Sequence, residues 1–436
     1  MTSQPPLAGS LACRLPRSLL DPSLGGLPPT GDDGTVALEL GHHLGRITTV
    51  RPWDGSRQHQ DRHHLPLALT PLVEPHAHLD KCFTAEQYPN PGGGMDGAME
   101  QNRREAAERT YELVSQRAEA ALERAWRYGL RAIRSHVDSG GPATRACWEA
   151  LLRLQRRWAG RVELQLVALT PLGFWSTPEG EDLACWVADR SGLLGGVLGP
   201  PYAHARADEA ALTVLLQLAE RLGVGVDLHV DEADQQPGLG VSLLLRVVQR
   251  LRPSIPITCS HAASLALMPQ RRLERLADQL AAAEMAIVAL PLTNLWLLGR
   301  RSSRTPMMRV QAPIRCLQRA GVTVAVGGDN VQDPWYPGGD FDPIEVLRLA
   351  PLTSHLWPGH RQGLVPLTTA GARLQGLSWD GVVRQGAPAD LLLLGAGSWT
   401  ELLARSPQRQ VWRSGQLLPP PPTQQPQQPF RAISMG

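Results

Sequence analysis

The chain has 436 residues, of which 42% are hydrophobic and 19% are charged, so it can bury the core of one large domain with an accessory domain, or of two to three ordinary domains. Its 43 basic and 41 acidic residues leave a net charge of +2, which predicts no nucleic-acid partner and no attraction to an anionic membrane. Six scattered cysteines without CxxC spacing are typical of free thiols in a reducing compartment. The first residues lack the basic and apolar segments of a signal peptide, and no run of about 20 apolar residues could cross a bilayer, so we expect a cytoplasmic protein.

Residues 1–69 are typical of short strands separated by turns. Residues 35–40 and 45–50 are strand-like segments between glycine and proline residues, and no long helix is expected there. We interpret this segment as the N-terminal part of a small β-domain.

Residues 70–364 alternate short apolar runs with amphipathic helical segments. The helical segments include residues 104–128, 144–158, 209–222 and 313–320. The apolar runs span residues 69–74, 130–135, 162–169, 193–198, 224–228, 255–260, 285–290 and 322–327. Continuously apolar strands between helices indicate βα units whose parallel strands are buried on both faces. Eight such units predict an α/β fold of the (β/α)₈ TIM-barrel type rather than an open sheet.

The remaining segment predicts one helix over residues 368–377 and strands over residues 390–394 and 410–413. We expect residues 365–416 to join residues 1–69 in a small composite β-sandwich beside the barrel. Residues 417–436 are rich in proline and glutamine and carry too few apolar side chains for a core, so they are predicted to be disordered.

Histidines follow several of the predicted strands, at the carboxyl ends where a barrel enzyme places its site. Five of the 13 histidines lie there, namely His76, His78, His136, His229 and His261. Side chains two positions apart on a strand point to the same side, so His76 and His78 can face one ion inside the barrel mouth. An isolated pair of this kind can also be ordinary hydrogen-bonding groups, whereas the whole set in strand-end register favours a metal centre. His136 fits a supporting or structural role as well as a direct one.

The predicted ligand set is His76, His78, His229 and Asp329, which follows the eighth strand. Three imidazoles and one carboxylate suit one divalent transition metal, Zn²⁺ or Fe²⁺, and leave room for a water molecule whose pKa the ion lowers to about 7. Glu232, three residues after His229, is the predicted proton carrier between this water and the leaving nitrogen. His261 is expected to polarise the attacked centre or orient the hydroxide, and Asp329 is expected to accept the remaining proton.

Six segments together resemble the ordered motif set of the cytosine deaminase-like amidohydrolases, over about residues 65–415. The segments are VEPHAHLDK, RSHVD, DLHVDEAD, TCSHA, PLTNLWLLGR and GGDNVQDPWYPGGDFDPIEVL. The resemblance implies a TIM barrel with a composite β-sandwich, one catalytic iron or zinc ion, and hydrolysis of exocyclic C–N bonds on pyrimidine-like or triazine-like rings. It implies the same ligand set and the same proton carrier, places His261 beside the attacking hydroxide, and adds Asn330 and Trp335 as residues that line the substrate pocket. The family tends to oligomerise, which is compatible with a homo-oligomer.

The lysine content bears on the number of metal ions. Binuclear members of the superfamily bridge two metals through a carboxylated lysine after the fourth strand. Here the fourth strand leads into residues 199–204, which contain no lysine, and the only lysine of the chain is Lys81, after the first strand. The resemblance therefore implies one metal rather than a lysine-bridged pair.

Two departures from the family pattern bear on the substrate. Cytosine deaminases carry a glutamine after the third strand that pairs with the ring amide, and Pro171 occupies or adjoins this position. Proline offers no side-chain donor or acceptor and no backbone N–H. Asn330 stands where bacterial cytosine deaminase has an aspartate, and an amide can donate to a ring carbonyl. Both changes leave the hydrolytic residues in place and argue against cytosine itself.

We therefore expect a metal-dependent deaminase that releases ammonia or an amine from a small cyclic amidine or a related heterocycle. The same residues could hydrolyse another C–N bond, such as that of an N-alkylamino-triazine or a cyclic amide. A non-catalytic barrel that only binds a ligand is the alternative from a different class, and the intact ligand set with Glu232 argues against it. Trp335 fits a core position as well as a pocket position.

Overall fold

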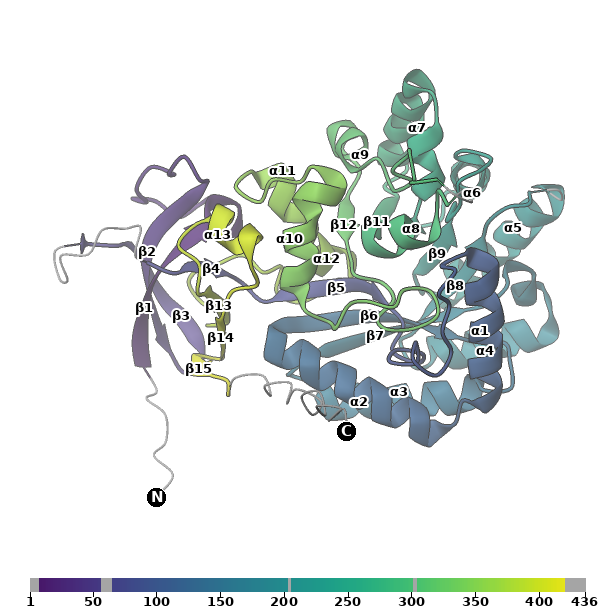
Figure 1. Cartoon of the computed structure of the whole chain (residues 1–436), viewed down its shortest axis with the longest axis horizontal. Helices are drawn as coiled ribbons and strands as arrows, with labels where there is room; N and C mark the ends of the chain where they lie inside the picture. The colour runs from purple at the N-terminus through teal and green to yellow at the C-terminus, as the bar shows by residue number, and fades with distance from the viewer. Residues whose placement is uncertain (1–7, 56–64, 203–204, 301–303, 420–436) are drawn as a thin grey trace, which may run out of the picture.

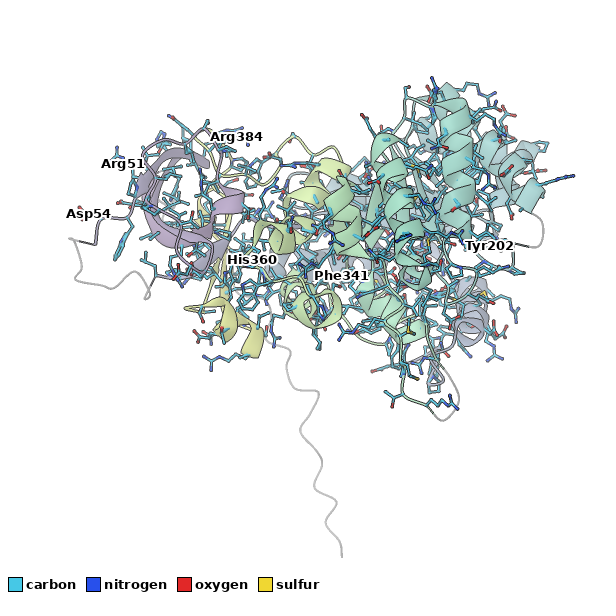
Figure 2. All side chains as sticks on the ribbon, turned by 90° about the horizontal axis from the view of Figure 1, so that it is seen from above. Arg51, Asp54, Tyr202, Phe341, His360 and Arg384 are labelled. Atoms are coloured by element: carbon cyan, nitrogen blue, oxygen red, sulfur yellow. The ribbon has the colours of Figure 1, made fainter. Side chains whose placement is uncertain are left out.

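The computed structural model describes residues 8–55, 65–202, 205–300 and 304–419. Figure 1 shows two parts side by side, a small β-domain that contains the first and last strands and a larger α/β barrel. Figure 2, seen from above, places Arg51 and Arg384 on the small domain and Tyr202 on the far side of the barrel. Residues 420–436, which make up most of the predicted disordered tail, lie outside the described residues.

Parallel strands form the barrel sheet in the order β5–β6–β7–β8–β9–β10–β11–β12. They span Leu72–Ala77 (β5), Leu130–Asp138 (β6), Glu163–Leu169 (β7), Leu193–Leu198 (β8), Val226–Val230 (β9), Ile257–His261 (β10), Ala286–Ala289 (β11) and Val324–Val326 (β12). A parallel bridge between Ala77 and Asp329 joins the segment after β12 to β5. The strands are largely buried, because helices cover the outer face of the sheet and side chains fill its interior. The predicted TIM barrel with eight strands is confirmed.

Helices follow most of the barrel strands. They span Met95–Glu108 (α1), Tyr111–Tyr128 (α2), Thr144–Trp158 (α3), Pro178–Ala188 (α4), Ala205–Leu222 (α5), Leu239–Leu251 (α6), Gln270–Ala282 (α7), Pro291–Leu297 (α8), Ile314–Ala320 (α9) and Pro343–Ser354 (α10). None of the helices within the described ranges is both long enough and apolar enough to cross a membrane.

The helix predicted over residues 104–128 is in fact two helices, α1 and α2. Arg109 has an extended backbone, so α1 ends there. Thr110 is the N-cap of α2, because its side chain accepts a hydrogen bond from the N–H of Leu113 in the first turn of that helix. The buried guanidinium of Arg109 forms ion pairs with Asp80, at 2.9 Å, and with Glu105. The helical periodicity continues through this point, but the ion pair with Asp80, which is distant in the sequence, holds Arg109 where α1 ends.

Strands from both ends of the chain form the small domain, in the order β15–β14–β13–β4–β1–β2–β3. They span Ala8–Pro16 (β1), Thr35–His43 (β2), Arg46–Pro52 (β3), Leu67–Leu69 (β4), Leu391–Leu394 (β13), Arg409–Arg413 (β14) and Gln416–Leu417 (β15). β4 lies between β1 and β13, so the N-terminal and C-terminal segments of the small domain pair directly through β4 and β13. The small composite β-domain is therefore present, as one continuous sheet whose core includes Leu15, Leu38 and Trp379.

Helix α12 (Thr369–Leu374) packs on the barrel, whereas the sequence analysis assigns residues 365–416 to the small β-domain. Its Ala372 contacts Val73 and Ala132, which lie near the amino ends of β5 and β6. The helix therefore covers the amino-terminal mouth of the barrel. The carboxyl ends of the strands remain available for a site.

Candidate metal centre

Four buried side chains converge at the carboxyl ends of the strands. The Nε2 atom of His76 lies 3.5 Å from Oδ1 of Asp329, and the Nε2 atom of His78 lies 3.3 Å from the same oxygen. The Nε2 atoms of His78 and His229 are 3.4 Å apart. Donor atoms held at about 2.1 Å from one ion in tetrahedral geometry lie about 3.4 Å from each other. The spacing therefore suits one ion shared by His76, His78 and Asp329, and the donor atoms of His229 form an overlapping group with those of His76 and His261.

The hydrogen bonding of these side chains also fits a cation. Among the described residues, Nε2 of His76 and both carboxylate oxygens of Asp329 are buried and have no hydrogen-bond partner. Leaving such groups unpaired costs roughly 1–3 kcal/mol each, and a metal ion would satisfy them together. Burial lowers the pKa of His76, His78 and His229 well below the usual value, so these rings are neutral and their lone pairs can bind a metal. Three nitrogens and one oxygen suit either zinc or iron.

The backbone aims the side chains at the strand ends. Asp231, His261 and Asp329 have φ values of +56°, +70° and +67°, a left-handed conformation that is uncommon outside glycine. The N–H of Asp329 donates to the carbonyl of His76 at 3.1 Å, which fixes the turned backbone against β5. Such strained positions are typical of functional sites.

Glu232 and His261 lie next to the convergent donors. The Oε1 atom of Glu232 is 3.5 Å from Nδ1 of His261, and Nδ1 is also 2.9 Å from Nδ2 of Asn294 on α8. Burial raises the pKa of Glu232 well above its usual value, and the charge of Asp329 raises it further. Burial lowers the pKa of His261 to about 4, so this ring is neutral near pH 7. A raised pKa makes the carboxylate a stronger base, so that it can accept a proton from water and later return it.

The loop that carries Glu232 is anchored by its neighbour. The carboxylate of Asp231 accepts hydrogen bonds from the N–H groups of Gly240, at 3.0 Å, and Val241, at 2.9 Å, in the first turn of α6. The hydroxyl group of Tyr202 donates to the same carboxylate. These contacts fix the backbone directly before Glu232.

The donor atoms of His136 group with those of His76 and Asp227 rather than with those of His78 and Asp329. The two rings are stacked, with centroids 3.9 Å apart and an interplanar angle of 28°. The Nε2 atom of His136 is 3.7 Å from Oδ2 of Asp227. This position favours a supporting role for His136.

The residues predicted to contact substrate differ in their placement. Nδ2 of Asn330 donates to Oδ2 of Asp333 at 2.7 Å, and the backbone N–H of Trp335 donates to Oδ1 of Asp333 at 2.9 Å. The indole of Trp335 packs at the edge of an apolar cluster that includes Leu297, so it combines a packing role with a place near the strand ends. Pro171 follows β7 but is exposed and does not join the convergent side chains.

Sequence reasoning missed two buried ionisable groups at the site. The carboxylate of Glu74 accepts the N–H groups of His76 and Gly328, at 3.1 and 3.0 Å, and burial raises its pKa to about 8. The ammonium group of Lys81 donates to Oδ1 of Asp138 at 2.7 Å. Burial opposes the charge of Lys81, but the neighbouring carboxylates of Asp138 and Asp80 raise its pKa on balance. The sequence signals for Lys81 are its place three residues after His78, in the segment VEPHAHLDK, and its being the only lysine of the chain.

Comparisons with known proteins agree with this geometry. The sequence model of the amidohydrolase family matches residues 104–419. The chain is 36% identical over 353 residues to the pterin deaminase of Rhizobium rhizogenes, covering 80% of this chain and 79% of that protein. It is 26% identical over 337 residues to the N-isopropylammelide isopropyl amidohydrolase of a Pseudomonas species, covering 74% of this chain and 78% of that protein. The crystal structure of 5-methylcytosine deaminase from Klebsiella pneumoniae superposes with a TM-score of 0.79 at 25% identity, covering 94% of this chain and 97% of that one.

Fold, site and relatives together define a hydrolytic enzyme that acts on C–N bonds. The chain belongs to the amidohydrolase family. Members of this family generally bind a divalent metal, and the cluster of histidines and Asp329 fits one.

Proposed function

We propose that this enzyme is a metal-dependent deaminase of amino-substituted heterocycles, with pterin as the first candidate substrate. In the reaction, water replaces the exocyclic amino group, so that a ring carbonyl forms and ammonia leaves. The observation that carries the proposal is the convergence of His76, His78, His229 and Asp329 beside Glu232. The 36% identity to a pterin deaminase supports the choice of ring.

In the proposed site, His76, His78, His229 and Asp329 hold one divalent ion. A bound zinc or iron ion supplies hydroxide near neutral pH, because it lowers the pKa of a coordinated water to about 7. Lys81 cannot bridge a second ion, because its ammonium group is buried and paired with Asp138.

The protein side chains carry the protons. Glu232 takes a proton from the attacking water and passes it to the leaving nitrogen, as its raised pKa allows. His261 is neutral and fixed by Asn294, so it orients the water without adding charge. Asp329 accepts the remaining proton when the ring carbonyl forms.

A second candidate reaction is the release of an alkylamine, because the chain also resembles an N-isopropylammelide hydrolase. The two reactions use the same water and the same carboxylate and differ only in the leaving group. A pocket that accepts an isopropyl group needs an apolar recess beside the leaving nitrogen, whereas a pocket for a bicyclic pterin needs depth along the ring plane.

The test is a product assay on enzyme loaded with zinc or iron, using pterin, N-isopropylammelide, cytosine, isoguanine and creatinine. We expect ammonia from pterin and little product from cytosine. Release of isopropylamine from N-isopropylammelide, without ammonia from any free amino ring, would favour the second candidate. Failure to bind either metal after reconstitution would reject both reactions and favour a ligand-binding barrel.

A further inference from the structure

The imidazole of His76 is linked to a buried ion pair through one hydroxyl group. Nδ1 of His76 lies 2.8 Å from Oγ of Ser260 on β10. Ser260 donates through the same oxygen to Oδ1 of Asp227 on β9, at 2.7 Å. Nη1 of Arg134 on β6 donates to the other oxygen of Asp227, also at 2.7 Å. All four side chains are buried in the barrel interior.

The direction of each hydrogen bond follows from the number of protons available. A serine hydroxyl group has one proton, and the carboxylate of Asp227 can only accept. The Ser260 proton is therefore used on Asp227, so the hydroxyl oxygen must accept a proton from Nδ1–H of His76. A neutral imidazole carries one ring proton, so Nε2 of His76 is left with a lone pair. That atom is the one that lies 3.5 Å from Asp329.

We propose that Ser260, Asp227 and Arg134 are positioning residues that hold His76 in its Nδ1–H tautomer and thereby prepare Nε2 to bind the metal. The proposal rests on the proposed ligand set but not on the proposed substrate. A ligand ring with a fixed tautomer and orientation loses less freedom when the ion binds, which raises the affinity.

Arg134, the residue of this network most distant from His76, is itself held by further hydrogen bonds. Arg134 also donates from Nε to Oε1 of Gln165, at 2.8 Å, and from Nη2 to the carbonyl of Leu374, at 2.9 Å. Leu374 is the last residue of α12, the helix that covers the amino-terminal mouth of the barrel. A continuous series of hydrogen bonds therefore connects α12, at the amino-terminal mouth of the barrel, with the imidazole of His76 at the carboxyl ends of the strands.

This arrangement distinguishes His76 from the other predicted ligands. The Nδ1 atoms of His78 and His229 are buried and have no hydrogen-bond partner among the described side chains. Of these three rings, His76 alone has an acceptor on the side away from the centre within the described part of the chain. Loss of Ser260 would leave Nδ1–H unpaired, or let the proton move to Nε2 and block the ligand position.

The main experiment measures zinc affinity by competition with a chromogenic chelator, without substrate. We expect Ser260→Ala to bind zinc roughly 10- to 100-fold more weakly than the wild-type enzyme. Ser260→Thr keeps the hydroxyl group and should restore most of the affinity. Ser264→Ala is the matched control, because Ser264 is equally buried and its hydroxyl group bonds to Gly238 and Asp231 rather than to a predicted ligand. Equal affinity in Ser260→Ala and the wild-type enzyme would overturn the proposal.

A spectroscopic measurement covers the case in which Ser260→Ala does not fold, as judged by circular dichroism. Two-bond ¹⁵N–¹H couplings in metal-free wild-type enzyme labelled at histidine report which ring nitrogen carries the proton. The signal of His76 is identified by its loss in His76→Asn. We expect Nδ1–H, and a protonated Nε2 would contradict the proposal. Neither measurement uses turnover, so inactivity towards pterin would count against the proposed function and leave this result unaffected.

Discussion

Ala77 and Asp329 are parallel neighbours at the seam where the barrel closes. The N–H of Asp329 donates to the carbonyl of His76, so the same backbone contact that joins the last strand to the first brings a carboxylate beside the two histidines of β5. Closure of the barrel and assembly of the candidate metal centre are therefore a single structural event.

Glu232→Gln should keep the metal and lose turnover. The amide is close in size to the carboxylate but cannot take a proton from the attacking water, and the loss of general acid–base catalysis typically costs roughly 10²- to 10⁴-fold. Metal content and kcat on the accepted substrate are measured together. Glu149→Gln, on the exposed face of α3, is the control and should match the wild-type enzyme. Near-normal kcat in Glu232→Gln would remove Glu232 from the mechanism.

His229→Ala should lower the metal content after purification. It removes one of the four convergent donors, and we expect zinc affinity to fall by roughly tenfold or more. Elemental analysis after equilibrium dialysis gives the stoichiometry. His43→Ala, at the exposed end of β2 in the small domain, should keep full occupancy. An unchanged stoichiometry in His229→Ala would show that the ligand assignment is wrong.

Removal of the metal should destabilise the enzyme. At a free metal concentration 100-fold above Kd, binding contributes about 2.7 kcal/mol to the free energy of unfolding. Chelated enzyme should therefore melt at a lower temperature than reloaded enzyme, and scanning calorimetry of the two samples measures the difference. Identical melting temperatures, with metal content verified in both, would contradict a shared ion at the buried donors.

Asn330 should recognise an N–H group of the substrate. One amide N–H is used on Asp333, and Oδ1 accepts no hydrogen bond from any described residue. Asn330→Asp alone places two carboxylates together and should lower kcat/KM by roughly 10- to 100-fold, equivalent to about 1–3 kcal/mol. The double variant Asn330→Asp with Asp333→Asn restores a hydrogen bond between an amide and a carboxylate at these two positions. It also keeps an oxygen at position 330 that can accept the substrate N–H, so it should recover most of the activity. If the substrate instead presents a carbonyl to the amide N–H, the double variant will stay impaired.

Asp333 should make stability fall with rising pH. Burial raises the pKa of Asp333 to about 7, whereas an unfolded aspartate has a pKa of about 3.9. Between these values the folded state holds a proton that the unfolded state has released, so the stabilisation present at low pH is lost as pH rises through about 7. Asp333→Asn cannot titrate and should show a weaker decrease in unfolding free energy between pH 5 and 8. Parallel slopes in urea denaturation of the two proteins would contradict this assignment.

The sequence predicted the barrel and the convergence for one physical reason. Parallel strands end at the same rim, so His76, His229 and Asp329 could be placed together from their positions after apolar runs. The polar neighbours behind them could not be predicted in this way. Ser260 and Arg134 lie inside strands, and nothing in the local sequence says which residues on other strands their side chains will meet.

The helix boundary at Arg109 was missed for a related reason. Local periodicity describes one helix through this position, whereas the buried ion pair with Asp80 comes from a loop after β5. Glu74 is similar, because its role depends on the N–H of Gly328, which follows β12 and is distant from Glu74 in the sequence. Contacts of this kind become visible only when the closed sheet brings distant segments together.

The sheet order of the small domain has a consequence for biosynthesis. β4 is made early, but its neighbour β13 leaves the ribosome only after every strand of the barrel has been translated. Until then one edge of β4 lacks its backbone partner and is open to pairing with other chains. Nascent chains that stop before β13 should therefore be prone to aggregation even when their barrel segment is complete.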